Sequence, residues 1–174
     1  AVAGPKPIVF VMGAIHAREY TTAETVMRFA EDLLARYPQD GDVRWMLDHH
    51  ELHILPHANP DGRKQAELGL LWRKNVNADY CQETPSQRGA DLNRNFPFEW
   101  GAHSGSSGDA CDSNFRGISP ASEPETAAVL AYLSSIFPDV RPSDLVSPAP
   151  SNNPGVFLDV HSYGKLVLWP WSFT

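Results

Sequence analysis

Residues 8–20 read IVFVMGAIHAREY, an apolar run that ends at a glycine and is followed by polar side chains. A short, β-branched run of this kind is typical of a buried strand, so we expect a strand over residues 8–12. A helix is predicted next, because Thr21 and Glu24 have the spacing of a capping box. Apolar side chains then recur at helical spacing, at Val26, Phe29, Ala30, Leu33 and Tyr37.

Three further segments have strand character. Residues 52–55 run into four turn formers at 59–62, and residues 156–160 end at a histidine. Residues 165–169 are a fourth candidate. These segments predict a sheet whose strand order cannot be read from the sequence.

The other elements complete an α/β pattern. Residues 75–118 show little periodicity and many turn formers, which predicts a long irregular loop region. Ser122 and Glu125 form a second capping box, ahead of a helix. Strands that alternate with helices predict an α/β sheet covered on both faces, and we expect residues 1–174 to form a single domain.

Composition excludes two classes of partner. The chain has 14 Lys and Arg against 21 Asp and Glu, and its net charge is −7. The basic residues are scattered, so no nucleic acid is expected to bind. No apolar run approaches the roughly 18 residues of a membrane span, so we expect no membrane partner either.

Cys81 and Cys111 lie in a region rich in Gly, Ser, Asp and Asn. They are either two unrelated thiols or a disulfide that ties down an irregular loop. The second interpretation fits better, because such a loop closes few backbone hydrogen bonds itself. A disulfide would indicate an oxidising compartment, although spacing does not establish connectivity.

Three side chains predict a metal site. His16 and Glu19 follow the first strand on one turn, and His161 directly follows the strand at 156–160. Functional groups of open α/β sheets gather beyond the carboxyl ends of the strands. Two His and one Glu would supply three ligands of a tetrahedral zinc site and leave the fourth position for water.

Other interpretations of these histidines stay open. His16 and Glu19 alone are more typical of a surface pair in the first turn of a helix, and it is His161, at the end of a buried strand, that favours a metal site. His57 also follows a strand and is an alternative ligand. The remaining histidines are typical of solvated surface positions; they are His49, His50, His53 and His103.

Five stretches carry a resemblance to a known family. Residues 13–20, 59–62, 71–74, 89–95 and 161–163 resemble zinc metallocarboxypeptidases of the pancreatic A/B type and their bacterial relatives, in the family's order. The resemblance implies an α/β fold with a mixed β-sheet and helices on both faces. It implies hydrolysis of the C-terminal peptide bond of peptides and proteins, by a secreted or periplasmic monomer.

The resemblance also implies residue roles. One Zn²⁺ ion would be bound by His16, Glu19 and His161. Asp91 matches the carboxylate that orients the first ligand histidine. Arg73 matches the catalytic residue that polarises the scissile carbonyl.

The substrate-binding residues follow from the same resemblance. Asn93 and Arg94 match the pair that recognises the free C-terminal carboxylate, and a guanidinium can grip a carboxylate with two parallel hydrogen bonds. Arg18 and Tyr163 match groups that line the next subsite. The two cysteines resemble the family's loop disulfide.

The chain departs from the family pattern in one respect. The general-base glutamate and the tyrosine that closes over the substrate lie downstream of the His161 motif in the family, and no carboxylate follows His161 here. We therefore expect an inner portion of a catalytic domain, truncated at both ends and nearly inactive by itself. Two rivals are a non-catalytic peptide-binding module and a metal-dependent deacylase; the motif at 71–74 and the predicted disulfide argue against the deacylase.

Overall fold

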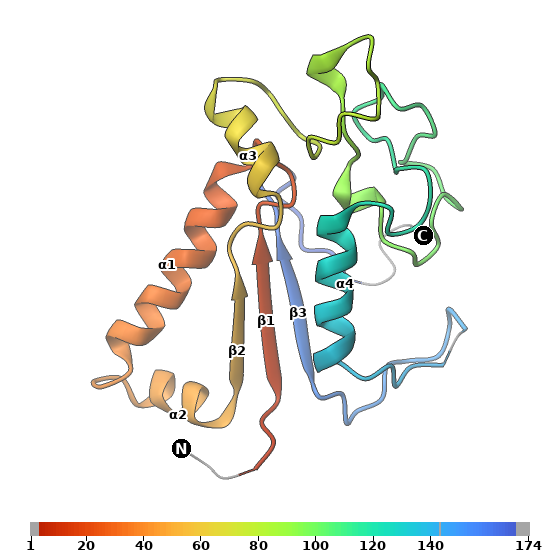
Figure 1. Cartoon of the computed structure of the whole chain (residues 1–174). Helices are drawn as coiled ribbons and strands as arrows, with labels where there is room; N and C mark the ends of the chain where they lie inside the picture. The colour runs from red at the N-terminus through yellow and green to blue at the C-terminus, as the bar shows by residue number, and fades with distance from the viewer. Residues whose placement is uncertain (1–3, 143, 170–174) are drawn as a thin grey trace.

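A computed structural model describes residues 4–142 and 144–169. Its centre is a parallel sheet with the strand order β2-β1-β3, in which β1 (Ile8–Gly13) lies between β2 (Glu51–Leu55) and β3 (Gly155–Val160). All three strands point the same way, so their carboxyl ends meet at one edge (Figure 1). The strands predicted at 8–12, 52–55 and 156–160 are confirmed.

Helices cover both faces of this sheet, which confirms the predicted α/β architecture. Alternate side chains of β1 point to opposite faces. Phe10 and Met12 pack with Val129 of α4 (Pro124–Ile136). On the other face, a Cβ at Gly13 would lie 3.1 Å from the Val26 side chain of α1 (Tyr20–Arg36), so only glycine lets this helix approach so closely.

Two details of the predicted sheet differ in the structure. The three described strands are parallel throughout, so they include none of the antiparallel neighbours that a mixed sheet would contain. Residues 165–169, predicted as a strand, are irregular. Their apolar side chains are largely exposed, so the apolar run reflects no burial in this structure.

The capping box predicted at Thr21 and Glu24 is wrong. The helix α1 (Tyr20–Arg36) has its N-cap at Glu19, two residues before the predicted cap, and the Glu19 side chain makes no capping hydrogen bond. The hydroxyl of Thr22 donates to the carbonyl oxygen of Glu19 at 2.8 Å. Glu19 is thus left free to turn its carboxylate away from the helix.

The second predicted capping box is wrong for a similar reason. The helix α4 follows Glu123, and that side chain makes no capping bond either. The hydroxyl of Ser122 donates to the Glu123 carboxylate at 2.8 Å, and α4 has Glu123, not Ser122, at its N-cap position. Glu125 turns back toward Asn75, whose amide donates to it at 3.2 Å.

The turn predicted at 59–62 is the start of a helix. Asn59 caps α3 (Pro60–Glu67) by accepting a hydrogen bond from the backbone of Gly62 at 3.0 Å. One further helix, α2 (Gly41–His49), connects α1 to β2. None of the helices in the described part of the chain has the length and apolarity to cross a membrane.

The long loop region predicted at 75–118 is confirmed. Its regular structure is limited to two 3-10 turns, Pro85–Gln87 and Leu92–Arg94, and one isolated bridge between Ser107 and Phe115. The disulfide between Cys81 and Cys111 is present and joins positions 30 residues apart. The loop region therefore depends on this bridge and on side-chain hydrogen bonds more than on regular backbone pairing.

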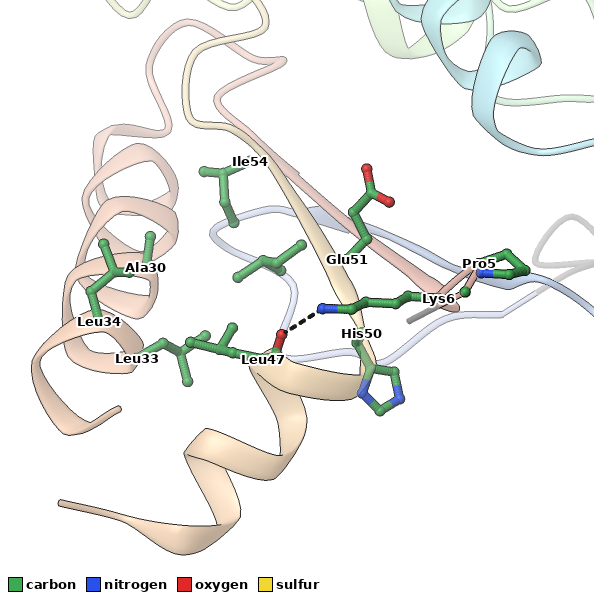
Figure 2. Close-up of a pocket in the computed structure, with 11 residues that line it drawn as sticks. Pro5, Lys6, Ala30, Leu33, Leu34, Leu47, His50, Glu51 and Ile54 are labelled. Carbon is green, nitrogen blue, oxygen red and sulfur yellow. Dashed lines mark hydrogen bonds between the residues drawn. The ribbon is translucent and has the colours of Figure 1, made fainter. Parts of the chain in front are cut away.

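A hollow of about 590 Å³ lies between α1, α2 and β2 (Figure 2). It is lined mainly by aliphatic side chains, and Lys6 spans it to donate to the carbonyl oxygen of Leu47 at 3.2 Å. Its lining includes neither the residues that directly follow β1 nor those that directly follow β3. The hollow is therefore separate from the edge where the carboxyl ends of the strands meet.

We expect the disulfide to contribute strongly to stability. Replacing both Cys81 and Cys111 with Ser should lower the free energy of unfolding by about 2–4 kcal/mol, because the bridge restricts the unfolded chain. Urea unfolding measures this change. Reduction of the unaltered protein is the matched control and should give the same loss, with no further loss in the double variant. Two free thiols in the unreduced, denatured protein would contradict the prediction.

Candidate metal centre and the cleft around it

His16 and Glu19 lie on the connection between β1 and α1. Both are buried, with 4% and 8% of their surface exposed. The backbone N–H of Glu19 donates to the carbonyl oxygen of His16 at 3.1 Å, which closes a tight turn. This turn brings His16 Nδ1 to 2.8 Å from Glu19 Oε1.

His161 reaches the same point from the neighbouring strand β3. Its Nδ1 lies 3.2 Å from Glu19 Oε2, and the two imidazole rings are 4.9 Å apart between centroids. The possible ligand atoms of His16, Glu19 and His161 all lie within 4.8 Å of one another. His57, the alternative ligand from the sequence, is not part of this group in the described structure.

The hydrogen bonds around the two imidazoles fit a bound cation. His16 Nε2 lies 3.2 Å from Asp91 Oδ1, and His161 Nε2 lies 2.9 Å from Asp159 Oδ2. A carboxylate only accepts, so each Nε2 carries a proton and each Nδ1 faces Glu19. The short contacts between Nδ1 atoms and Glu19 then require a further proton or a cation. This donor set, with each histidine backed by a carboxylate, suits zinc.

Asp91 connects the imidazole to a guanidinium. It is fully buried and accepts from Nε and Nη2 of Arg73 at 3.0 and 2.8 Å, besides its contact with His16. Burial alone would raise the pKa of Asp91, but His16 and Arg73 outweigh it and hold the pKa below its usual value. The structure thus places Asp91 against the first histidine, where the sequence predicted it.

The charges at the centre shift the acid–base behaviour of two of its groups. Burial would raise the pKa of Glu19, but hydrogen bonds from His16, His161 and the backbone of Ser162 outweigh it, and the pKa lies well below its usual value. Hydrogen bonds to Asp159 and Glu19 raise the pKa of His161 to about 9. The site therefore attracts positive charge strongly.

Asp159 is a site residue that the sequence reasoning missed. Its side chain is 19% exposed, and Oδ1 is buried without a hydrogen-bond partner in the described structure. A signal was present in the sequence, because residues two apart on a strand share a face. Asp159 and His161 have this spacing, so a carboxylate beside the third predicted ligand was foreseeable.

A cleft of about 1170 Å³ surrounds the centre and contains most of the predicted substrate-binding residues. Arg18, Arg73, Asn93 and Tyr163 all line it. The amide of Asn93 lies 3.5 Å from His161 Nε2, while Tyr163 is fully exposed. These predicted residues are therefore gathered around the candidate ligands.

Arg94 is the predicted residue that the structure places outside this cleft. Its Nε donates to the carbonyl oxygen of Gly105 at 2.8 Å, and Nη1 donates to that of Asn93 at 3.0 Å. It lines an adjacent hollow of about 310 Å³, which shares Asn93 with the cleft. The two residues of the predicted pair therefore line different hollows: Asn93 lines the cleft and the adjacent hollow, and Arg94 lines the adjacent hollow alone.

The chain is similar to known proteins of one family. A family model described as zinc carboxypeptidase matches residues 2–174. Metallocarboxypeptidase A of Trichophyton rubrum is 32% identical over 172 residues, which cover 97% of this chain and 36% of that protein. Zinc carboxypeptidase A 1 of Anopheles gambiae is 33% identical over 175 residues, which cover 98% of this chain and 35% of that protein.

A solved structure shares the fold and this partial coverage. The crystal structure of carboxypeptidase A from Helicoverpa armigera matches with a TM-score of 0.68 and 28% identity, over 91% of this chain and 34% of that one. The chain thus spans about a third of the length of the relatives it matches. Because the family model covers nearly every residue, the chain belongs to the zinc carboxypeptidase family.

Proposed function

We propose that the protein is a zinc-dependent exopeptidase that hydrolyses the C-terminal peptide bond of peptides and proteins. One zinc ion would be held by His16, Glu19 and His161. The observation that carries this proposal is the pair of imidazoles whose Nε2 atoms contact carboxylates while both Nδ1 atoms face Glu19. Family membership agrees with zinc as the metal.

Arg73 would stabilise the oxyanion that forms at the scissile carbonyl. A zinc ion supplies Lewis acidity and an activated water to such a reaction. The two bonds from Arg73 to Asp91 fix the guanidinium at the wall of the cleft, so its charge is in place before the reaction begins. Charge that needs no reorganisation is the most effective kind of transition-state stabilisation.

Asn93 and Arg94 would bind the free C-terminal carboxylate of the substrate. For this, Arg94 must exchange its bond to the carbonyl oxygen of Gly105 for one to the substrate. The exchange is favourable, because a carboxylate brings an opposite charge and can accept two parallel hydrogen bonds from the guanidinium, which a single carbonyl oxygen does not. An internal peptide bond offers no such carboxylate, so cleavage would be restricted to chain ends.

Secretion or export to the periplasm completes the proposal. Its support is the disulfide between Cys81 and Cys111, since such bridges persist in oxidising compartments. The partners would then be peptides and proteins with free C-termini outside the cytosol.

The metal assignment predicts a zinc content of one ion per chain. His16→Ala and His161→Ala should each lose the ion after dialysis against a weak chelator, because each removes one of three ligands. His57→Ala is the matched control and should retain it. Metal analysis by mass spectrometry measures the content, and unchanged zinc in both ligand variants would overturn the assignment.

Asp159 should orient His161 toward the metal. Replacing Asp159 with Asn should weaken zinc binding by about tenfold to 100-fold, the usual effect of removing a carboxylate behind a ligand histidine. The affinity is measured by competition with a chelator of known strength. Asp61→Asn, which alters an exposed carboxylate of α3, should leave it unchanged. Equal affinities for all three proteins would show that Asp159 has no such role.

The exopeptidase proposal predicts a dependence on the free C-terminus. The full-length protein should release the terminal residue of a peptide, and a chelator should abolish this activity. Amidation of the same peptide should reduce the rate by at least about 100-fold, because Asn93 and Arg94 then have no carboxylate to bind. Mass spectrometry of the products measures both rates. Equal cleavage of the free and amidated peptides would contradict an exopeptidase.

A further inference from the structure

A second hollow, of about 400 Å³, adjoins the metal cleft and concentrates positive charge. It shares Arg18, Leu71 and Arg73 with the cleft, so the two are continuous. The chain as a whole carries a net charge of −7, which makes a local excess of cations notable. The cations that line this basic hollow are Arg18, Arg73, Lys74 and Arg88.

Two of these cations already have partners. Arg73 is bound to Asp91, as described above. Lys74 is buried and donates to the carbonyl oxygens of Ala110 and Asp112 at 2.9 and 3.0 Å. Lys74 is therefore held in the wall of the hollow by these bonds. Arg73 is held by Asp91 at the boundary with the cleft, where the proposed function assigns it to the scissile carbonyl.

Arg18 and Arg88 differ from them. Neither forms an ion pair within residues 4–142 and 144–169, whereas Arg28, Arg36 and Arg63 each contact a carboxylate. The Nε of Arg88 is buried and donates to no acceptor in this part of the chain. A buried donor without an acceptor is costly, so this guanidinium favours an incoming anionic group.

The side chain of Trp72, which also lines the hollow, lies near the guanidinium of Arg88. Its guanidinium lies 6.0 Å from the centroid of the Trp72 ring, at the limit of a cation–π contact. Trp72 is itself buried, and its indole donates to the carbonyl oxygen of Asn75 at 3.0 Å. The one acidic residue of the hollow, Asp112, accepts from Ser107 and forms no ion pair with Arg88 in the described structure.

The position of the basic hollow relates it to the upstream part of a substrate. A terminal carboxylate bound at Asn93 and a scissile carbonyl beside Arg73 would orient the peptide along the cleft. The residues before the scissile bond would then continue past Arg73 toward Arg18 and Leu71, which open into the hollow. An extended peptide advances by about 3.3 Å per residue, so two or three residues reach across a hollow of this size.

We propose that the basic hollow binds an acidic side chain of the substrate, within the two or three residues that precede the scissile bond. Arg88 and Arg18 would supply the charge, and substrates with Glu or Asp there would be selected over their amide counterparts. This inference rests on the proposed exopeptidase function, because that function sets the direction of the peptide.

The test uses two phosphinic peptides, in which a phosphinate replaces the scissile bond so that no cleavage occurs. They differ only in carrying Glu or Gln at the second and third residues before that bond. Fluorescence anisotropy measures their binding to the zinc-loaded protein at low and high salt. We expect the Glu peptide to bind about tenfold more tightly at low salt, with a smaller ratio at high salt.

The variants distinguish an effect of the charge on Arg88 from an effect of the net charge of the protein. Arg88→Gln should bring the ratio close to one, and Arg88→Lys should retain part of it. Arg28→Gln removes the same charge from an exposed position of α1 and should keep the full ratio. Zinc content and thermal unfolding of each variant verify that it is folded, and Arg88→Lys is the informative variant if Arg88→Gln is unstable.

The outcomes distinguish this inference from the proposed function. If both peptides bind in a zinc-dependent manner and with equal affinities, the proposed role of the basic hollow is wrong and the exopeptidase proposal stands. A preference for Glu that survives Arg88→Gln unchanged would also overturn it. Absence of zinc-dependent binding to either peptide would contradict the proposed function itself, and this inference with it.

Discussion

The carboxylate of Asp91 lies fully buried between His16 and Arg73, and the cleft is organised around it. A buried charge costs several kcal/mol unless it is paired and hydrogen-bonded, so removing either partner would leave an uncompensated charge. The backbone of Asp91 also donates to the carbonyl oxygen of Phe115 at 2.8 Å. One residue, through its side chain and its backbone, therefore fixes a candidate ligand, the candidate oxyanion cation and the disulfide loop relative to one another.

Loops without regular backbone pairing can hold Asp91 because a second buried carboxylate supports them. Glu123 is fully buried and accepts from Asn75 at 2.8 Å and from Tyr80 at 2.9 Å, yet it contacts no cation among the described residues. Asn75 in turn accepts from the backbone of Ala90, next to Asp91, at 2.8 Å. Such a network is stabilising only when every member is satisfied, which explains why side chains that looked like helix caps are used here instead.

The sequence predicted those features of the fold and site that follow from a single physical rule. A buried strand over residues 8–12 and ligands beyond strand ends follow from hydrophobicity and sheet geometry, so the convergence of His16, Glu19 and His161 was predictable. The second capping box failed because Ser122 bonds to the carboxylate of Glu123. That carboxylate is held by Asn75 and Tyr80, which are tertiary contacts that local spacing does not encode. The position of Arg94 likewise depends on a carbonyl group eleven residues away.

The charge distribution unites the two candidate binding regions. Glu19, Asp91 and Asp159 surround the imidazoles, and Arg73 balances only one of these three carboxylates. A divalent cation would balance the other two, and the raised pKa of His161 shows the same demand met by a proton. The guanidiniums of Arg18 and Arg88 lie beside this centre and form no ion pair among the described residues. A candidate binding site for a cation therefore lies next to a candidate binding site for an anion. The metal would occupy the cation site, and a substrate with carboxylates on both sides of its scissile bond would place one of them in the anion site.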